Sequence, residues 1–223
     1  MAREIPDMTV KFLVSIDRAR GLADATENLE LAIYYHERYP HAVVGVDFSG
    51  DPSRERATSY LPLLATAKRN GLFVSVHVGE TTDADDNAAL LTAGADRLGH
   101  AYHIQPTHGG SAELLDAVVR SRTPIEVCLS SNVQAGLATS YEEHPFRAWR
   151  ALDHPVALCT DDKGLFNTTL SAEYAIASRA FAMSEKDLYD LSESSIEYIA
   201  CGEEVKSRLR SLWAEKRGLL LSP

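Results

Sequence analysis

The sequence predicts a single α/β domain, spanning residues 1–223, in which short buried strands alternate with helices. Six short runs rich in apolar residues recur along the chain, and helical patterns lie between them. The polar ends of successive runs are separated by roughly 20 to 33 residues. Alternation at this spacing is typical of a parallel sheet, in either a barrel or a doubly wound arrangement.

The predicted strands are mostly continuous apolar runs rather than alternations of polar and apolar residues. Such runs are typical of strands that are covered on both faces of a parallel sheet. In chain order, the predicted strands are residues 9–17, 42–50, 72–80, 96–101, 124–132 and 155–162.

Amphipathic helices are predicted between the strands, because apolar residues recur there at helical spacing. The segment 83–92 opens with acidic residues, which favour a helix N-terminus. After Asp162 the pattern becomes mainly helical and predicts a helical C-terminal tail. The predicted helices are residues 22–39, 53–70, 83–92, 112–121, 170–183, 185–198 and 203–212.

The composition excludes several classes of protein. The 223 residues are 45% hydrophobic and 24% charged, as in ordinary globular proteins. Acidic residues outnumber Lys and Arg by 32 to 22, which argues against duplex nucleic acid as a partner. The 3 cysteines form no C-x-x-C zinc pattern, and we expect Cys128 and Cys159 to be buried, small apolar residues. We expect a cytoplasmic protein without membrane attachment, because no signal-like or membrane-length apolar stretch occurs.

Polar residues gather at the C-terminal ends of the predicted strands, where parallel α/β folds build their active sites. In VHVGE, Gly79 would let the backbone turn so that His77 and Glu80 face one cavity. In RLGHA, His100 follows another glycine. Taken singly, each histidine is more often a core or loop residue with satisfied hydrogen bonds than a functional residue.

Asp161 and Asp162 are adjacent carboxylates behind an apolar run. Burying both is costly unless a cation or hydrogen-bond donors meet them. One could be the N-cap of a following helix. A divalent metal would explain both, and His with Asp ligands suits catalytic zinc.

Other residues at this edge have two interpretations each. Gly50 would allow a flat ligand to approach the backbone, or it forms a simple turn before Pro52. Ser131 and Asn132 could be site residues or capping residues. Several common motifs do not occur in the sequence. The glycine-rich motifs that bind phosphates and dinucleotides are absent, and so is the G-x-S-x-G motif of many hydrolases. The H-x-E and P-C-x-x-C motifs of the zinc deaminases that act on flipped bases are absent as well.

Five motifs in order give the sequence its resemblance to a known family. VGVDFSGDP, VHVGE, RLGHA, EVCLSSN and CTDDKGLF resemble strands four to eight of the adenosine deaminase family, with VSIDR as strand three. The details SIDR, SGDP, CLSSN and TDDKG resemble the adenosine-deaminase-like branch, whose members act on N6-methyl-AMP and related nucleotides. The resemblance implies a (β/α)8 TIM-barrel fold.

The resemblance also implies catalytic roles. His77 and Asp161 would be ligands of one zinc ion, which activates a water to attack purine C6. Glu80 would protonate purine N1, so that the ring does not accumulate negative charge. His100 would orient the water and take its proton.

Three further residues would hold the purine substrate, as the resemblance implies. Asp162 would receive a hydrogen bond at or near N7. Gly50 would contact N3 through its backbone, and Asp17 would help to hold the nucleotide. The expected partner is a small purine nucleoside or its 5′-monophosphate, and the choice between them stays open, as does the oligomeric state.

One family motif is missing. The family begins with a strand carrying H-x-H, which supplies two more zinc ligands, and no H-x-H occurs here. We therefore expect an incomplete barrel, with strands one and two absent, and an incomplete ligand set for the Zn2+ ion. Weak metal binding and little deaminase activity of the chain by itself would follow.

Two alternatives to a deaminase remain. A non-catalytic, shortened isoform could bind a partner through the open edges of its sheet. A different metal-dependent hydrolase of the wider amidohydrolase type is the other alternative.

Overall fold

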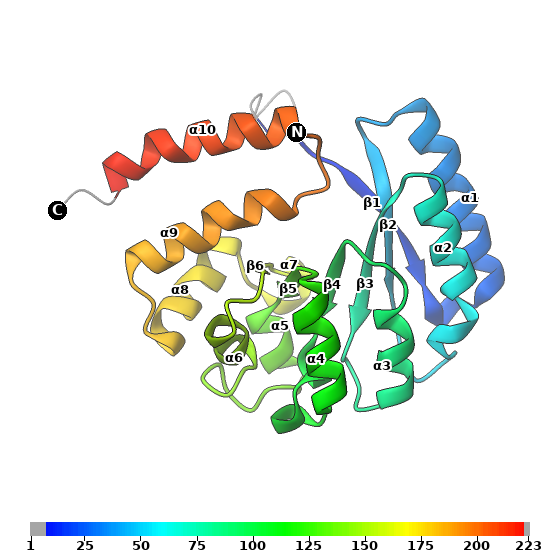
Figure 1. The fold of residues 1–223 in the computed structure, drawn as a ribbon, viewed down its shortest axis with the longest axis horizontal. Helices are drawn as coiled ribbons and strands as arrows, with labels where there is room; N and C mark the ends of the chain where they lie inside the picture. Colours follow the sequence, from blue (N-terminus) through cyan, green and yellow to red (C-terminus); the bar gives the residue numbers. More distant parts are fainter. Residues whose placement is uncertain (1–7, 221–223) are drawn as a thin grey trace.

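Six strands pair in chain order to form one parallel sheet (Figure 1). The computed structural model describes residues 8–220. The strands are β1 (Phe12–Asp17), β2 (Val43–Ser49), β3 (Phe73–Val78), β4 (Arg97–His100), β5 (Ile125–Val127) and β6 (Val156–Leu158).

Helices α1 to α4 follow the first four strands and pack side by side against the sheet (Figure 1). Helices α8 to α10 lie beyond β6, and α10 begins beside the start of the described chain and runs away from it (Figure 1). The helices are α1 (Leu22–Arg38), α2 (Leu61–Arg69), α3 (Ala84–Leu91), α4 (Ala112–Ser121), α5 (Leu129–Gln134), α6 (Phe146–Ala151), α7 (Lys163–Phe166), α8 (Leu170–Phe181), α9 (Glu185–Ser194) and α10 (Glu203–Leu220).

All six predicted strands are confirmed in type and order, and the predicted fold class is confirmed with them. Sequential parallel strands with helices on the outside are the arrangement of part of a (β/α)8 barrel. Within residues 8–220 the sheet is open, because β1 and β6 each pair with one neighbour. No helix in this range is long and apolar enough to cross a membrane.

Several predicted boundaries were wrong. The helix predicted over 53–70 begins at Leu61, because the preceding residues form a loop and a short 3-10 turn that contact Arg18. The strand predicted over 124–132 ends at Val127, and Ser131 and Asn132 lie in helix α5. The helix predicted over 185–198 ends at Ser194, and that predicted over 203–212 continues to Leu220. Cys128 is buried as expected, whereas Cys159 is partly exposed.

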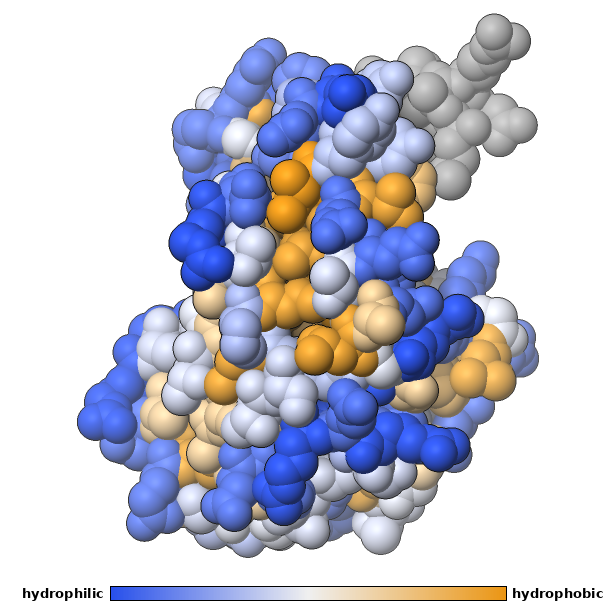
Figure 2. Space-filling view, turned by 90° about the vertical axis from the view of Figure 1, so that its right-hand side faces the viewer, coloured by the Kyte–Doolittle hydropathy of each residue, from blue (hydrophilic) through white to orange (hydrophobic). Residues whose placement is uncertain are grey.

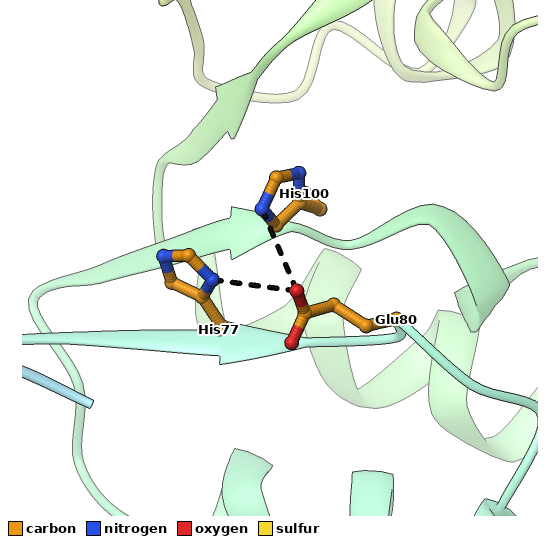
Figure 3. A group of neighbouring side chains, drawn as sticks. All are labelled: His77, Glu80 and His100. Carbon is orange, nitrogen blue, oxygen red and sulfur yellow. Dashed lines mark ion pairs between the residues drawn. The ribbon is translucent and has the colours of Figure 1, made fainter. Parts of the chain in front are cut away.

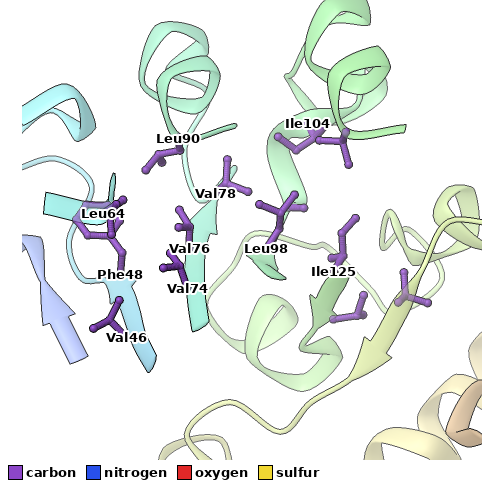
Figure 4. Packing of buried hydrophobic residues seen from close by; sticks show 14 of the residues in the cluster. Val46, Phe48, Leu64, Val74, Val76, Val78, Leu90, Leu98, Ile104 and Ile125 are labelled. Atoms are coloured by element: carbon purple, nitrogen blue, oxygen red, sulfur yellow. The ribbon is translucent and has the colours of Figure 1, made fainter. Parts of the chain in front are cut away.

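The core lies between the sheet and its helices. Alternate residues of β2, β3 and β4 point toward α2 and α3, so their aliphatic side chains interdigitate with those of the helices (Figure 4). The residues that Figure 4 labels are Val46, Phe48, Leu64, Val74, Val76, Val78, Leu90, Leu98, Ile104 and Ile125. The intervening residues of the same strands, including Asp47, Ser75 and His77, therefore face the opposite side of the sheet.

A buried ion pair joins the end of β1 to α3. The Arg18 guanidinium contacts the Asp86 carboxylate through Nη1–Oδ2 (2.9 Å) and Nη2–Oδ1 (3.2 Å). Asp86 Oδ1 also accepts from the Ala57 amide at 2.7 Å, and Arg18 Nε donates to the Glu55 carbonyl at 3.0 Å. Arg18 is 3% exposed, so removing its partner would leave a buried charge uncompensated.

Replacing Asp86 should therefore destabilise the fold strongly. We expect Asp86→Ala to lower the free energy of unfolding by about 3–5 kcal/mol, measured by urea denaturation. Asp116→Ala is the matched control, because Asp116 also pairs with an arginine, Arg120, but on the exposed surface of α4. The control should change the free energy of unfolding little. Equal effects of the two substitutions would contradict this account of Arg18.

Candidate active site

The carboxyl ends of β3, β4 and β6 bring four predicted site residues together. Glu80 Oε1 lies 3.5 Å from His77 Nδ1 and 3.8 Å from His100 Nε2 (Figure 3). His100 Nε2 lies 3.9 Å from Asp161 Oδ2. His100 is thus the link between the His77–Glu80 pair and Asp161.

Two glycines make room for this arrangement. The His77 ring lies against Gly99 of the neighbouring strand, where an added Cβ would come within 2.6 Å of His77 Cδ2. Gly79, with φ of +70°, reverses the backbone between His77 and Glu80, as the sequence predicted. The His77 and His100 rings then meet edge to face, with centroids 4.7 Å apart.

The backbone of two site residues is strained. His100 and Asp161 have φ of +58° and +53°, in the left-handed region that non-glycine residues rarely occupy. Such strain persists when the surrounding structure over-determines a conformation, and it clusters at functional sites. Both side chains are also anchored: Ser131 Oγ donates to Asp161 Oδ2 at 2.6 Å, and Asn132 contacts His100.

Acidic residues surround His77. Its Nε2 lies 3.6 Å from Asp47 Oδ2, opposite the contact with Glu80. Burial lowers the pKa of His77, but the hydrogen bond to Glu80 and the charges of Asp47, Glu80 and Glu126 outweigh burial and raise this pKa to about 9. Burial raises the pKa of Asp47 above its usual value. The site therefore favours a positive charge at the position of His77.

The charge of His77 changes the pKa values of Glu80 and His100. Burial would raise the pKa of Glu80, but the hydrogen bond and charge of His77 hold it below its usual value. Burial lowers the pKa of His100, and the nearby charge of His77 lowers it further. Glu80 is thus ionised and His100 neutral near pH 7.

On the side away from Glu80, His100 contacts buried Asn132, which in turn contacts buried His144. Asn132 Nδ2 lies 3.1 Å from His100 Nδ1, and His144 Nε2 lies 2.9 Å from Asn132 Oδ1. The Phe146 amide donates to His144 Nδ1 at 3.1 Å. Asn132 and His144 are each 1% exposed.

The remaining predicted residues lie beside this cluster. Asp17 and Gly50 are neighbours at the ends of β1 and β2, where an added Cβ on Gly50 would meet Asp17 Oδ1 at 1.9 Å. Gly50 has φ of +95°, so glycine suits this turn on both grounds. Asp17 also accepts from the Ala19 amide. Asp162 is exposed at the N-cap of α7 and makes no capping hydrogen bond.

Three neighbours of the site were missed in the sequence. Asp47 carried a signal, as the carboxylate inside the apolar strand VVGVDFS. Asn87 of α3 accepts from the Gly79 amide and donates to the Thr81 carbonyl, both at 2.8 Å, and so fixes the turn that carries Glu80. His144 lies in a loop without periodicity, and no local pattern connects it to His100.

The donors fit a divalent cation. His77, Glu80 and His100 form one group whose ligand atoms lie within 4.8 Å of one another, and His100, Cys128 and Asp161 form another. Among the described residues, no such group holds both His77 and Asp161, the two predicted ligands. Imidazole and carboxylate are zinc donors, and the carboxylates that hold a proton on His77 would also stabilise a metal ion.

Comparison with known proteins gives a consistent set of relatives. The family model described as Adenosine deaminase matches residues 2–216. The chain is 38% identical to the N6-Methyl-AMP deaminase of Danio rerio, over 96% of this chain and 62% of the relative. It is 38% identical to that of Homo sapiens, over 93% of this chain and 59% of the relative.

Solved structures share the fold. Arabidopsis ADAL complexed with GMP superposes with a TM-score of 0.85 at 33% identity, covering 92% of this chain and 58% of that one. Arabidopsis ADAL complexed with IMP gives 0.87 at 32% identity, covering 95% and 60%. The chain thus spans about three fifths of the length of the proteins that it matches.

The burial of His144 predicts a specific dependence of stability on pH. Burial lowers the pKa of His144 from 6.5 to about 3, so the unfolded chain binds a proton that the folded chain does not bind between these pH values. The resulting stability is present above pH 6.5 and is lost as the pH falls toward 3. The loss amounts to a few kcal/mol, because each tenfold change in proton affinity corresponds to about 1.4 kcal/mol.

His144→Gln tests this dependence, because glutamine does not titrate. We expect the free energy of unfolding of the variant to fall less steeply than that of the wild type below pH 6.5. His41→Gln, on an exposed histidine, should retain the wild-type slope. Parallel curves for wild type and His144→Gln would show that His144 is not held neutral by the fold.

Proposed function

The chain belongs to the adenosine deaminase family, and we propose that its site serves the hydrolytic removal of the 6-amino or 6-methylamino group of a purine 5′-monophosphate. The observation that carries the proposal is the convergence of His77, Glu80, His100 and Asp161 at one edge of the sheet. The names of the relatives, N6-Methyl-AMP deaminase, and the GMP and IMP in neighbouring structures support the substrate class.

We propose His77 and Asp161 as protein ligands of one zinc ion. The carboxylates around His77 supply the negative charge that a dication requires. The His100 ring is close to both ligands, with its centroid 4.7 Å from that of His77 and its Nε2 3.9 Å from Asp161 Oδ2. Zinc at this position would supply Lewis acidity, which lowers the pKa of a water molecule toward about 7.

The other residues would act directly on the substrate. Glu80 is ionised before the substrate binds, so it would take a proton from the attacking water and give it to purine N1. The proton on N1 would prevent negative charge from accumulating on the ring as the water oxygen adds at C6. His100 would orient the attacking water through Nε2, the ring atom that faces Glu80 and Asp161. Ammonia or methylamine would then leave from C6 with the second proton of the water, and a carbonyl would form at C6.

The purine would lie toward the ends of β1 and β2. Gly50 would contact N3 through its backbone, and Asp17, its neighbour, would help to hold the nucleotide. Asp162 would receive a hydrogen bond at or near N7. Its exposed carboxylate makes no capping bond with the helix that follows, so it is available to a ligand.

A second candidate function is binding of a protein partner at the edge of the sheet. The edge strand β1 carries Phe12, which is 60% exposed, and the side of the molecule that carries α1 shows a hydrophobic area bordered by polar surface (Figure 2). Exposed apolar edges favour association. Turnover by the deaminase test below would favour catalysis over this alternative.

The test of the proposed function is a deaminase assay on the chain joined to a segment that supplies a family strand with H-x-H. With zinc present, we expect release of methylamine from N6-methyl-AMP. Glu80→Gln should lower kcat/KM roughly 100- to 10,000-fold, because the proton donor to N1 is lost.

Glu27→Gln is the matched control, since Glu27 is exposed on α1 and remote from the site. This control should keep full turnover. A folded fusion protein that turns over neither N6-methyl-AMP nor adenosine would contradict the proposed function. Undiminished turnover by Glu80→Gln would contradict the role of that residue.

A further inference from the structure

A chain of hydrogen bonds behind His100 begins at a backbone amide. The Phe146 N–H donates to His144 Nδ1 at 3.1 Å. Because a backbone amide can only donate, Nδ1 of His144 carries no proton. His144 is 1% exposed and its low pKa keeps it neutral, so its single proton lies on Nε2.

The proton on His144 fixes the orientation of the Asn132 amide. His144 Nε2–H faces Asn132 Oδ1 at 2.9 Å and donates to it. The opposite orientation would bring the Asn132 NH2 group against the His144 N–H, and two donors would face each other in a buried site. Asn132 therefore presents its NH2 group to His100 and donates to Nδ1 at 3.1 Å.

We propose that His144 and Asn132 are positioning residues that hold His100 in the tautomer with its proton on Nε2. The proposal deepens the proposed function and rests on it for its catalytic meaning. His100 Nδ1 is engaged as an acceptor, so the ring presents its N–H toward Glu80 Oε1 at 3.8 Å and Asp161 Oδ2 at 3.9 Å. All three members of the chain are buried, which leaves little access for water to replace a missing partner.

The hydrogen bonds that run from the Phe146 amide through His144 and Asn132 to His100 form a relay. This relay changes the role of His100 at the reacting centre. A ring that carries its proton on Nε2 has no lone pair there, so it donates a hydrogen bond to water or to a carboxylate. Protonation at Nδ1 would require the Asn132 amide to turn and to break its bond with His144. His100 thus orients the water as a donor, and the structure does not favour the role of proton acceptor that the family resemblance implied.

The tautomer can be read directly by long-range 1H–15N correlation NMR on the purified 223-residue chain. This experiment distinguishes a protonated ring nitrogen from an unprotonated one, and His100→Asn assigns the signals by removing them. We expect His100 to show a protonated Nε2 and an unprotonated Nδ1. A wild-type protein with the proton on Nδ1 would overturn the proposal.

Asn132→Asp is the decisive variant, because it keeps the shape and replaces the donor to His100 with an acceptor. The two nitrogen resonances of His100 should exchange positions, since Nδ1 must now donate. An unchanged tautomer in this variant would contradict the relay. Asn70→Asp, the same substitution at an exposed helix end, should leave the His100 spectrum unchanged.

Two substitutions of His144 cover the case in which Asn132→Asp does not fold. His144→Gln retains a side-chain NH2 that can donate to Asn132, so it should preserve the Nε2–H tautomer. His144→Leu removes the donor and should give a mixture of tautomers. Identical spectra for both variants would count against the proposal, because a purely structural role of His144 would not distinguish them.

The NMR spectrum tests the tautomer of His100, and the deaminase assay tests the proposed function, so either can be contradicted without the other. The spectrum is recorded without substrate or metal. The expected tautomer in a protein that deaminates no purine would support the relay as a structural device but leave it without the catalytic role proposed here. The wrong tautomer in an active enzyme would overturn the relay alone.

Discussion

The site depends on holding several carboxylates close together on the inner side of a parallel sheet. Asp47, Glu80 and Glu126 all act on His77, and their mutual repulsion in a partly buried site is costly without positive charge. Arg97 forms an ion pair with Glu126, with an Nε–Oε1 distance of 2.5 Å. His77 contacts the other two carboxylates, Asp47 and Glu80. The same excess of negative charge favours the binding of a cation. Several local features of the structure follow from this requirement.

These features are the close packing of the His77 ring, the strained backbone of His100 and Asp161, and the hydrogen bonds that hold those two side chains. Gly99 removes a side chain where the His77 ring must lie, and left-handed backbone at His100 and Asp161 turns their side chains toward the site. Such conformations are costly, so the surrounding hydrogen bonds must hold them. Ser131 anchors Asp161, and Asn132 anchors His100. Both anchors come from one short helix, α5, so β5 and its helix support two different reactive residues.

Much of the fold could be predicted from the sequence because strand order and helix spacing are local patterns. The turn in VHVGE could be predicted from the motif itself, because the glycine between His77 and Glu80 allows the backbone conformation that the structure shows. The segment CLSSN could not be predicted in the same way, because its conformation depends on contacts with Asp161 and His100. His144 could not be connected to the site at all, because its contact with Asn132 exists only after the loop before α6 has folded against α5. The start of α2 was hard to place for a similar reason: the buried Arg18–Asp86 pair, and not the periodicity, determines the path before α2.

Family membership explains why these residues occur in this order, and the physical chemistry of the site explains what they require. The proposed zinc site requires His77 and Asp161 to bind one metal ion between them. Anomalous X-ray diffraction from crystals grown with zinc tests it most directly. We expect an anomalous peak at about 2.0–2.2 Å from a ring nitrogen of His77 and a carboxylate oxygen of Asp161. A folded protein whose zinc lies elsewhere, or whose site shows no peak at saturating zinc, would contradict it.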